Sequence, residues 1–295
     1  MKFPDTKIQF RNYCLCERAM TAKNFRTIVR HMERILEYLE TENFNKINEN
    51  TIREFLSQES NKKSWSPKTY RSFLQSIRTF FRWCLSKNYV ISNPTDRIEK
   101  PKLPRRLPRC LTMKEVQKVF ECARQYNWLY KFERTRNMAI LFTFLYTGIR
   151  LNELLHLRIQ DVNIDSHEIY IHKAKGGKNR TVPIHTELAV VIRDYINERE
   201  DVGKISKWFF TGIHSNKRLY EKNIHEICRK LSIKSGIKFT PHMLRHTFAR
   251  MVCEADVNLY KLKELLGHSH VNTTQIYLSV SNEGMKKSLG TVRFL

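Results

Sequence analysis

The sequence predicts a mainly α-helical protein with one small β-hairpin, divided into two domains. Helical spacing of apolar residues runs through the first ninety residues, and a basic, proline-rich segment follows. Beyond residue 112, further helical patterns flank one pair of alternating apolar stretches. The 295 residues suffice for two domains of about 100–200 residues each, and a 41% hydrophobic content is enough to form packed cores.

Residues 1–95 are expected to form the first, helical domain. One helix follows from apolar residues spaced three and four apart, which would form one buried face. A second helix is expected to begin at Ser66-Pro67, because serine caps helices and proline suits their first turn. The apolar residues of the first helix are Phe25, Ile28, Val29, Met32, Ile35, Leu36 and Leu39.

The second helix of this domain carries a basic face formed by Lys68, Arg71, Arg78 and Arg82. Such a face is often only a solvated surface. No acidic residue is interleaved on it, however, and the whole chain is strongly basic. Contact with DNA phosphates is therefore an equally good interpretation.

Residues 96–111 are expected to link the two domains. The surrounding stretch, "ISNPTDRIEKPKLPRRLPRCLT", contains four prolines, which forbid a continuous helix, and six basic residues against two acidic ones. Arg105 and Arg106 in this segment are further candidates for phosphate contact, although a solvated linker would have the same composition.

Residues 112–295 are expected to form the second domain. "TMKEVQKVFECA" and "TRNMAILFTFLYTG" have helical patterns, and the second is apolar enough for a core helix. "EIYIHKAKGGKNRTVPI" alternates apolar residues on both sides of Gly176-Gly177, which predicts a β-hairpin with a basic tip.

The charge of the chain indicates a polyanionic partner. Fifty-three Lys and Arg residues against 29 Asp and Glu give a net charge of +24. An anionic membrane is the weaker candidate, because no apolar run approaches the ~18 residues that span a bilayer and no signal peptide is recognisable. Seven scattered cysteines are typical of free thiols in a reducing cytoplasm. We therefore expect a cytoplasmic protein whose partner is nucleic acid.

Four segments of the second domain carry side chains suited to phosphate chemistry. In "TGIRLNEL", Arg150 and Glu153 lie one turn apart at a predicted helix start, where the carboxylate could hold the guanidinium. In "TPHMLRHTFARMV", Thr240-Pro241 predicts a helix start that presents His242 and Arg245 on one face, next to free backbone N–H groups.

The other two segments are the basic hairpin tip and "LLGHSHVNTTQIY". The tip lacks the pattern of a nucleotide-binding P-loop, since GGK is followed by Asn179. Zinc binding by His242 and His246 is disfavoured, because a metalloprotease helix needs Glu where Met243 stands. We expect no metal site. Tyr277, in the last segment, would by itself be an ordinary structural aromatic.

Taken in order, the segments TGIRLNEL, AKGGKNRTVPI, HMLRHTFA and LLGHSHVNTTQIY resemble the tyrosine recombinase (phage integrase) family, most closely its Xer-type simple site-specific recombinases. The resemblance covers residues 112–277. It implies a helical core-binding domain and a mixed α/β catalytic domain that form a clamp on DNA. It also implies that strands are broken and rejoined without metal, ATP or any other cofactor.

The resemblance assigns roles to particular residues. Tyr277 would attack the scissile phosphate and form a 3′-phosphotyrosyl link, while Arg150 and Arg245 would stabilise the transition state. Lys175 would protonate the leaving 5′ oxygen. The remaining members would be His242, which assists with the tyrosine proton, His268, which binds the phosphate, and Glu153, which supports Arg150.

The resemblance also implies partners. These are double-stranded DNA with paired short recognition sites, further copies of the chain in a tetramer and, where one is needed, a partner recombinase or activator. The eighteen residues after Tyr277 are expected to contact a neighbouring copy. Strand exchange through a Holliday junction would serve chromosome dimer resolution or mobile-element integration, at the nucleoid. The alternatives are a type IB topoisomerase, a telomere resolvase and a DNA-binding accessory protein that has lost catalysis; a metal-dependent relaxase fits less well.

Overall fold

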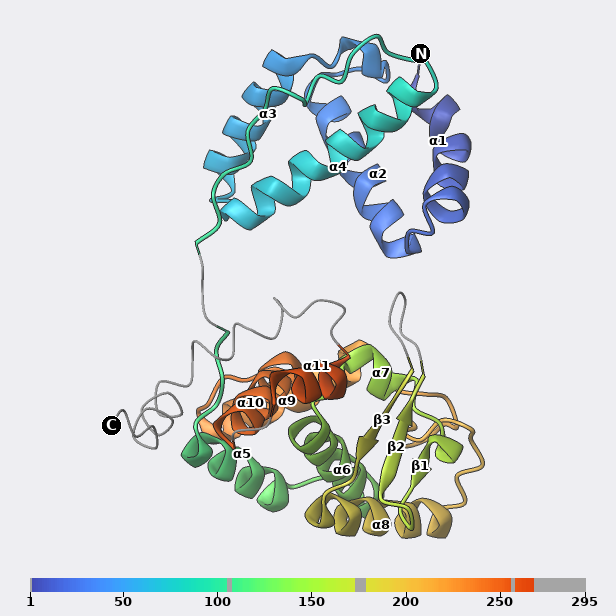
Figure 1. The fold of residues 1–295 in the computed structure, drawn as a ribbon, viewed down its shortest axis with the longest axis vertical. Helices are drawn as coiled ribbons and strands as arrows, with labels where there is room; N and C mark the ends of the chain where they lie inside the picture. The colour runs from blue at the N-terminus through green and yellow to red at the C-terminus, as the bar shows by residue number, and fades with distance from the viewer. Residues whose placement is uncertain (1, 105–107, 173–178, 256–257, 268–295) are drawn as a thin grey trace, which may run out of the picture. The chain divides into compact units, whose positions relative to one another are not determined.

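The chain folds into two compact units, Met1–Arg105 and Arg106–Leu295. The computed structural model describes residues 2–104, 108–172, 179–255 and 258–267, and Figure 1 shows the order of their elements. The prediction of a mainly helical chain with one small sheet is confirmed. The boundary between the units lies inside the segment 96–111.

The first unit is helical and is built around aromatic side chains. Phe10, Phe80 and Trp83 are fully buried and contact one another with ring centroids 5.0–5.7 Å apart. The hydroxyl of Ser66 accepts a hydrogen bond from the Thr69 backbone N–H, as expected for a helix cap. Its helices are α1 (Phe3–Asn12), α2 (Ala22–Tyr38), α3 (Glu49–Lys62) and α4 (Pro67–Ser86), with a short π-helix at Tyr13–Glu17 and a 3-10 turn at Phe44–Lys46.

The second unit combines seven α-helices with one sheet in its described residues. Its elements are α5 (Met113–Gln125), α6 (Lys131–Thr147), α7 (Leu151–Leu155), a 3-10 turn (Ile159–Asp161), β1 (Val162–Asn163), β2 (Glu168–Ile171), β3 (Arg180–Pro183), α8 (Thr186–Asp201), α9 (Glu221–Ser235), α10 (Pro241–Glu254) and α11 (Leu259–Leu266).

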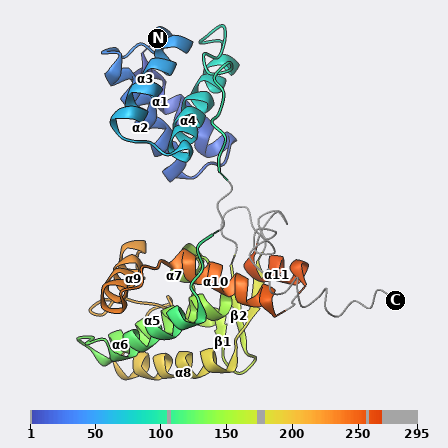
Figure 2. The same cartoon turned by 90° about the vertical axis from the view of Figure 1, so that its left-hand side faces the viewer.

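Helix α6 forms the centre of this unit. It is apolar around most of its circumference, and twelve of its residues are buried. Helix α8 packs along it, and α5 and α10 contact it as well (Figure 2). The predicted core helix is therefore confirmed, and it ends at the point where the candidate site begins.

The sheet is antiparallel with the order β1-β2-β3. Ile169 pairs with Val182, and Ile171 pairs with Arg180. The predicted hairpin is confirmed, although its tip, residues 173–178, lies outside the described residues. Strand β1 was not predicted, since two residues are too few to show an alternating pattern.

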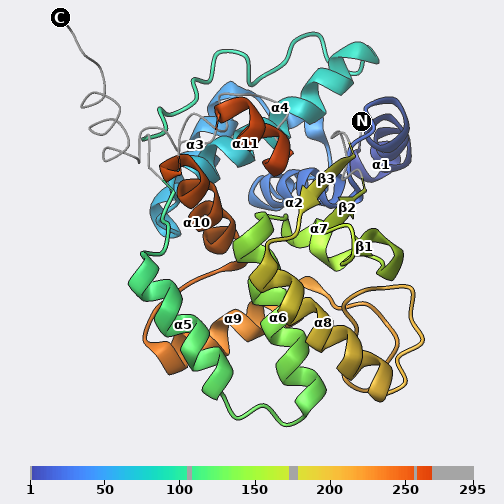
Figure 3. The ribbon, with the colours of Figure 1, turned by 60° about the horizontal axis from the view of Figure 1, so that its bottom comes forward.

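Helices α10 and α11 lie against each other at the end of α6 (Figure 3). Phe248, Leu262 and Leu266 belong to a small buried cluster between them. This packing brings the end of α11 to the turn between α6 and α7. Among the described residues, no helix has the length and apolar character needed to cross a membrane.

Candidate active site

Arg150 is placed by a tight turn between two helices. Helix α6 ends at Gly148, which adopts the left-handed conformation with φ +58°, and Arg150 is the N-cap of α7. Glu153 then reaches back: its Oε2 accepts from the Arg150 backbone N–H at 2.9 Å, and its Oε1 accepts from Arg150 Nη1 at 2.8 Å. The predicted pairing of Arg150 with Glu153 is thus present in the structure.

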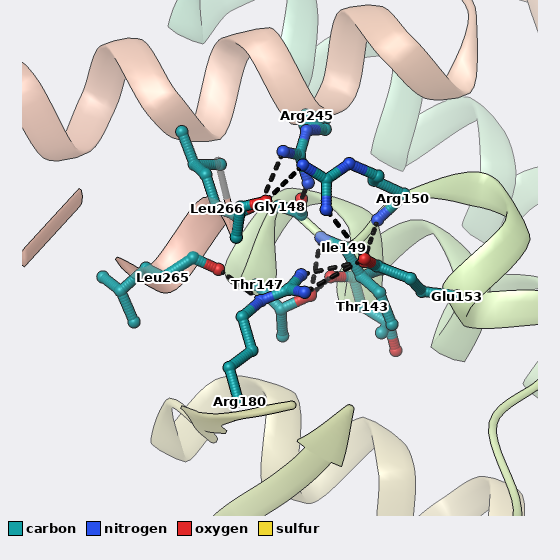
Figure 4. Close-up of polar contacts among 11 residues, drawn as sticks. Thr143, Thr147, Gly148, Ile149, Arg150, Glu153, Arg180, Arg245, Leu265 and Leu266 are labelled. Carbon is teal, nitrogen blue, oxygen red and sulfur yellow. Dashed lines mark hydrogen bonds and ion pairs between the residues drawn. The ribbon is translucent and has the colours of Figure 1, made fainter. Parts of the chain in front are cut away.

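Glu153 is held by a second arginine, Arg180 of strand β3. Arg180 Nη1 donates to Oε1 at 3.0 Å, and Nη2 donates to Oε2 at 2.8 Å (Figure 4). Burial alone would raise the pKa of Glu153, but the hydrogen bonds and charges of Arg180 and Arg150 outweigh it and lower the pKa to about 2. The carboxylate is therefore ionised at any physiological pH.

Arg180 was missed as a site residue, since the sequence placed it only among the basic residues of the hairpin. A signal for it existed. Arg180, Val182 and Ile184 alternate, so the arginine occupies an inward position of the strand. Because a charged side chain on a buried face needs a partner, this position predicts an ion pair without identifying the acid.

Three arginines hold the end of helix α11. Arg180 Nε donates to the Leu265 carbonyl at 2.8 Å, Arg245 Nη2 to the Leu266 carbonyl at 2.7 Å, and Arg150 Nη2 to the Gly267 carbonyl at 2.6 Å. The first two of these bonds are drawn in Figure 4. Helices leave their last carbonyls without internal partners and with a partial negative charge, which cations compensate.

Arg245 also bonds the turn after α6. Its Nη1 donates to the Gly148 carbonyl, and the residue as a whole is buried. As predicted, Thr240 caps α10, accepting from the Met243 N–H, and Pro241 is in the first turn. Arg150 and Arg245, 95 positions apart in the chain, therefore bind neighbouring carbonyls.

His242 lies in the first turn of α10, as expected. Partial loss of hydration lowers its pKa, and the positive charges of Arg245, His225 and Arg150 lower it further. The imidazole is therefore neutral at neutral pH and able to accept a proton. His246 lies one turn later. Burial lowers its pKa, and the charges of His242 and Arg245 lower it further.

Three predicted catalytic residues, Lys175, His268 and Tyr277, lie outside the described residues. Lys175 is five residues before Arg180, and His268 directly follows Gly267. Within the described ranges, no group of three or more His, Cys, Asp or Glu side chains is arranged to hold a metal ion.

The basic face of α4 is present in the first unit. Within residues 2–104, none of Lys68, Arg71 and Arg82 forms an ion pair. Loss of hydration and then the charges of Arg78, Arg71 and Arg82 lower the pKa of Lys100. Positive charges thus gather here without acidic compensation.

Arg78 differs from the other residues of this face. Its Nη2 donates to the carbonyls of Thr95 and Ile98 at 2.6 and 3.0 Å, so its guanidinium stabilises the segment after α4. Its Nε also donates to the Thr95 hydroxyl at 3.2 Å. The helical pattern could not indicate these bonds, because the acceptors belong to an irregular stretch. Arg105 and Arg106 lie outside the described residues.

Known proteins are similar to this chain over most of its length. The model of the phage integrase family matches residues 109–283, and that of the phage integrase N-terminal SAM-like domain matches residues 10–91. Tyrosine recombinase XerA of Pyrococcus furiosus is 31% identical over 234 residues, which cover 79% of this chain and 77% of that protein. Tyrosine recombinase XerD of Staphylococcus saprophyticus is 32% identical over 227 residues, which cover 75% of each.

Solved structures show the same fold. A XerH site-specific recombinase bound to a palindromic difH substrate, in a post-cleavage complex, matches with a TM-score of 0.77 and 22% identity over 97% of this chain and 84% of that one. A lambda integrase dimer bound to a core site matches with a TM-score of 0.73 and 16% identity over 92% of this chain and 97% of that one.

Proposed function

This chain belongs to the phage integrase family and is a tyrosine-type site-specific DNA recombinase, and on that premise we propose that Tyr277 is its nucleophile and that the arginine cluster binds the scissile phosphate. The observation that most directly supports this proposal is that Arg150 and Arg245 both donate hydrogen bonds to backbone carbonyls at the end of α11. Gly267, which directly follows α11, is one residue before His268 and ten before Tyr277.

The chemistry follows from the charges involved. The Tyr277 oxygen attacks phosphorus, the bond to the 5′ oxygen breaks, and a 3′-phosphotyrosyl ester forms. Negative charge increases on the non-bridging oxygens of the pentacoordinate transition state, where Arg150 and Arg245 stabilise it. Since the new ester conserves the energy of the old one, a second strand can attack it without ATP. Exchange of both strand pairs then proceeds through a Holliday junction.

Protons have assigned donors and acceptors in this proposal. A tyrosine hydroxyl has a pKa of about 10, so it needs a base or nearby positive charge to attack at neutral pH. His242 suits the role of base, because its lowered pKa keeps it neutral. Lys175 protonates the leaving 5′ oxygen, His268 donates to the phosphate, and Glu153 holds Arg150 in position.

The proposed partner is double-stranded DNA with paired short sites, since solved neighbours are recombinases bound to DNA. The uncompensated face of Lys68, Arg71 and Arg82, with Arg105 and Arg106, supplies phosphate contacts outside the active site. A tetramer assembled on DNA, contacts from the residues after Tyr277 and a location at the nucleoid belong to the same proposal. The proposal also includes a partner recombinase or activator where one is needed.

The decisive experiment captures the covalent intermediate. Cells that express the protein are denatured rapidly, the chain is isolated with its attached DNA, and both the DNA end and the adducted peptide are sequenced. A unique DNA end on Tyr277 is expected. Adducts at many unrelated sequences would favour a type IB topoisomerase instead, and adducts only at linear chromosome ends would favour a telomere resolvase.

The matched variant is Tyr277→Phe, which removes only the attacking oxygen. We expect duplex DNA affinity within about twofold of wild type and no detectable adduct, because the phosphate contacts remain and the nucleophile is lost. Tyr260→Phe, at an exposed position of α11, is the control and should form adducts normally. An adduct from Tyr277→Phe would refute the assignment, and a wild-type chain that binds DNA but never cleaves it would support the accessory-protein alternative.

A further inference from the structure

Arg180 joins two elements of the active site. It opens strand β3 opposite Ile171, and its side chain is only 10% exposed. All three guanidinium nitrogens have partners: two donate to the two oxygens of Glu153, and the third donates to the Leu265 carbonyl. Such a bidentate pair fixes a carboxylate in both position and plane.

The partners of Arg180 lead directly to Arg150. Glu153 is 2% exposed and accepts from both arginines, whereas the Arg150 side chain is 34% exposed. A buried carboxylate is stable only when its charge is compensated, and Arg150 alone provides a single side-chain bond to it. Without Arg180, the support behind Arg150 would lose two of its four donors.

The same guanidinium also lies against the end of α11. Gly267 has φ +61°, and a Cβ atom built on it would be 2.7 Å from Arg180 Nη1 and 3.2 Å from Arg150 Nη1. Glycine is therefore required at this point both for its conformation and for the close approach of the two arginines. The chain continues from here to His268 and Tyr277.

We propose that Arg180 is a positioning residue for DNA cleavage, acting through Glu153 on Arg150 and through the Leu265 carbonyl on the start of the segment that carries Tyr277. This inference rests on the proposed function, because it assumes that Arg150 and Tyr277 act on the phosphate. Arg180 itself does not contact the DNA: its nitrogens are occupied by the protein. Replacing Arg180 should therefore lower the rate of DNA cleavage and leave DNA affinity nearly unchanged.

The test compares Arg180→Ala and Arg180→Lys with wild type. Lysine keeps the charge but cannot bond both carboxylate oxygens and a carbonyl together, so it should not restore function. The probe is an end-labelled duplex that carries the DNA site recovered from the wild-type adduct. Single-turnover cleavage should fall about 100-fold in both variants, since a small displacement of a catalytic group costs that much. Affinity for the duplex should change less than about threefold, because the phosphate contacts remain.

A double-mutant cycle separates positioning from direct contact. If Arg180 acts through Glu153, the double variant Arg180→Ala/Glu153→Gln should lose much less cleavage than the product of the two single losses. Fully multiplied losses would show that Arg180 acts independently of Glu153 and would overturn the proposed path to Arg150. Arg193→Ala, which removes an exposed arginine of α8, is the control and should cleave at the wild-type rate.

Two further results would overturn the proposal. Cleavage by Arg180→Lys and Arg180→Ala at nearly the wild-type rate overturns the proposal, and so does a loss confined to affinity. If thermal melting shows that Arg180→Ala does not fold, Arg180→Lys carries the test alone. Failure of the wild-type chain to form any adduct bears on the proposed function and its need for a partner recombinase or activator, which is a different result from normal cleavage by the variants.

Discussion

Glu153 is the residue whose charge state the candidate site depends on most. Its pKa is lowered from about 4.5 to about 2, because bonds and charges from Arg180 and Arg150 overcome the effect of burial. A carboxyl group with a depressed folded-state pKa stabilises the protein fully above its unfolded pKa. That contribution is lost as the pH falls through about 4.5 toward about 2.

A pH series of unfolding measurements checks this sign. The shift corresponds to about 3 kcal/mol at pH 7, of which about 60% should be gone at pH 3. We therefore expect Glu153→Gln to be less stable than wild type at pH 7 and the difference to narrow as the pH falls from 5 to 3. Denaturant titrations at each pH measure it. Glu121→Gln, exposed on α5, is the control, and a wild-type-to-Glu153→Gln difference that stays constant down to pH 3 would contradict the prediction.

What the sequence predicts at this scale depends on how far apart the partners are. Arg150 and Glu153 are three residues apart on one helix start, so their contact followed from spacing alone. Arg180 is 27 residues from Glu153, and its partner depends on how β3 packs against α7. Its inward strand position indicated a need for a partner, but only the fold shows which one.

At the scale of elements, the turn that ends α6 determines where the site residues lie. Gly148 has φ +58°, and a Cβ atom built on it would overlap the Phe248 ring at Cδ1. The residue therefore meets two requirements: a left-handed conformation, and close packing of α10 and α11 against the turn that leads to Arg150.

Gly148→Ala and Gly236→Ala separate these two requirements. Gly236 ends α9 with φ +70°, but no atom lies within 4 Å of the position that an alanine methyl group would take there. Gly236→Ala should cost about 1 kcal/mol for the left-handed conformation alone. Gly148→Ala should cost about 1–3 kcal/mol more, because Phe248 must move. Urea unfolding followed by circular dichroism measures both, and equal losses would contradict the packing argument.

Elements with strong end signals could be predicted, and those without could not. Ser66-Pro67 and Thr240-Pro241 mark the starts of α4 and α10, and both helices begin there. The hairpin followed from alternation, whereas the two residues of β1 carry no pattern and are a strand only because β2 pairs with them. The candidate site follows the same rule. Its arginines lie in predicted elements, but their hydrogen bonds to the end of α11 depend on how those elements pack together in the folded chain.

At the scale of the whole molecule, the main property to explain is the large positive net charge. Each unit has its own hydrophobic core, and both cores consist of apolar side chains. A net charge of +24 opposes folding through self-repulsion, so its use must lie in binding a polyanion. The sequence predicts this property from composition alone, without any knowledge of the fold.

The salt dependence of DNA binding tests which charges take part. For duplex DNA, each phosphate contact contributes about −0.9 to the slope of log affinity against log salt concentration. Lys68→Gln/Arg82→Gln, on the uncompensated face of α4, should make that slope less negative by about 1.8. The measurement uses a duplex of about 30 base pairs and arbitrary sequence. The control pair Arg193→Gln/Lys234→Gln removes the same charge from exposed positions of α8 and α9. An equal reduction in both would mean that net charge acts without a defined face, whereas a reduction confined to the first pair identifies α4 as a phosphate-binding helix.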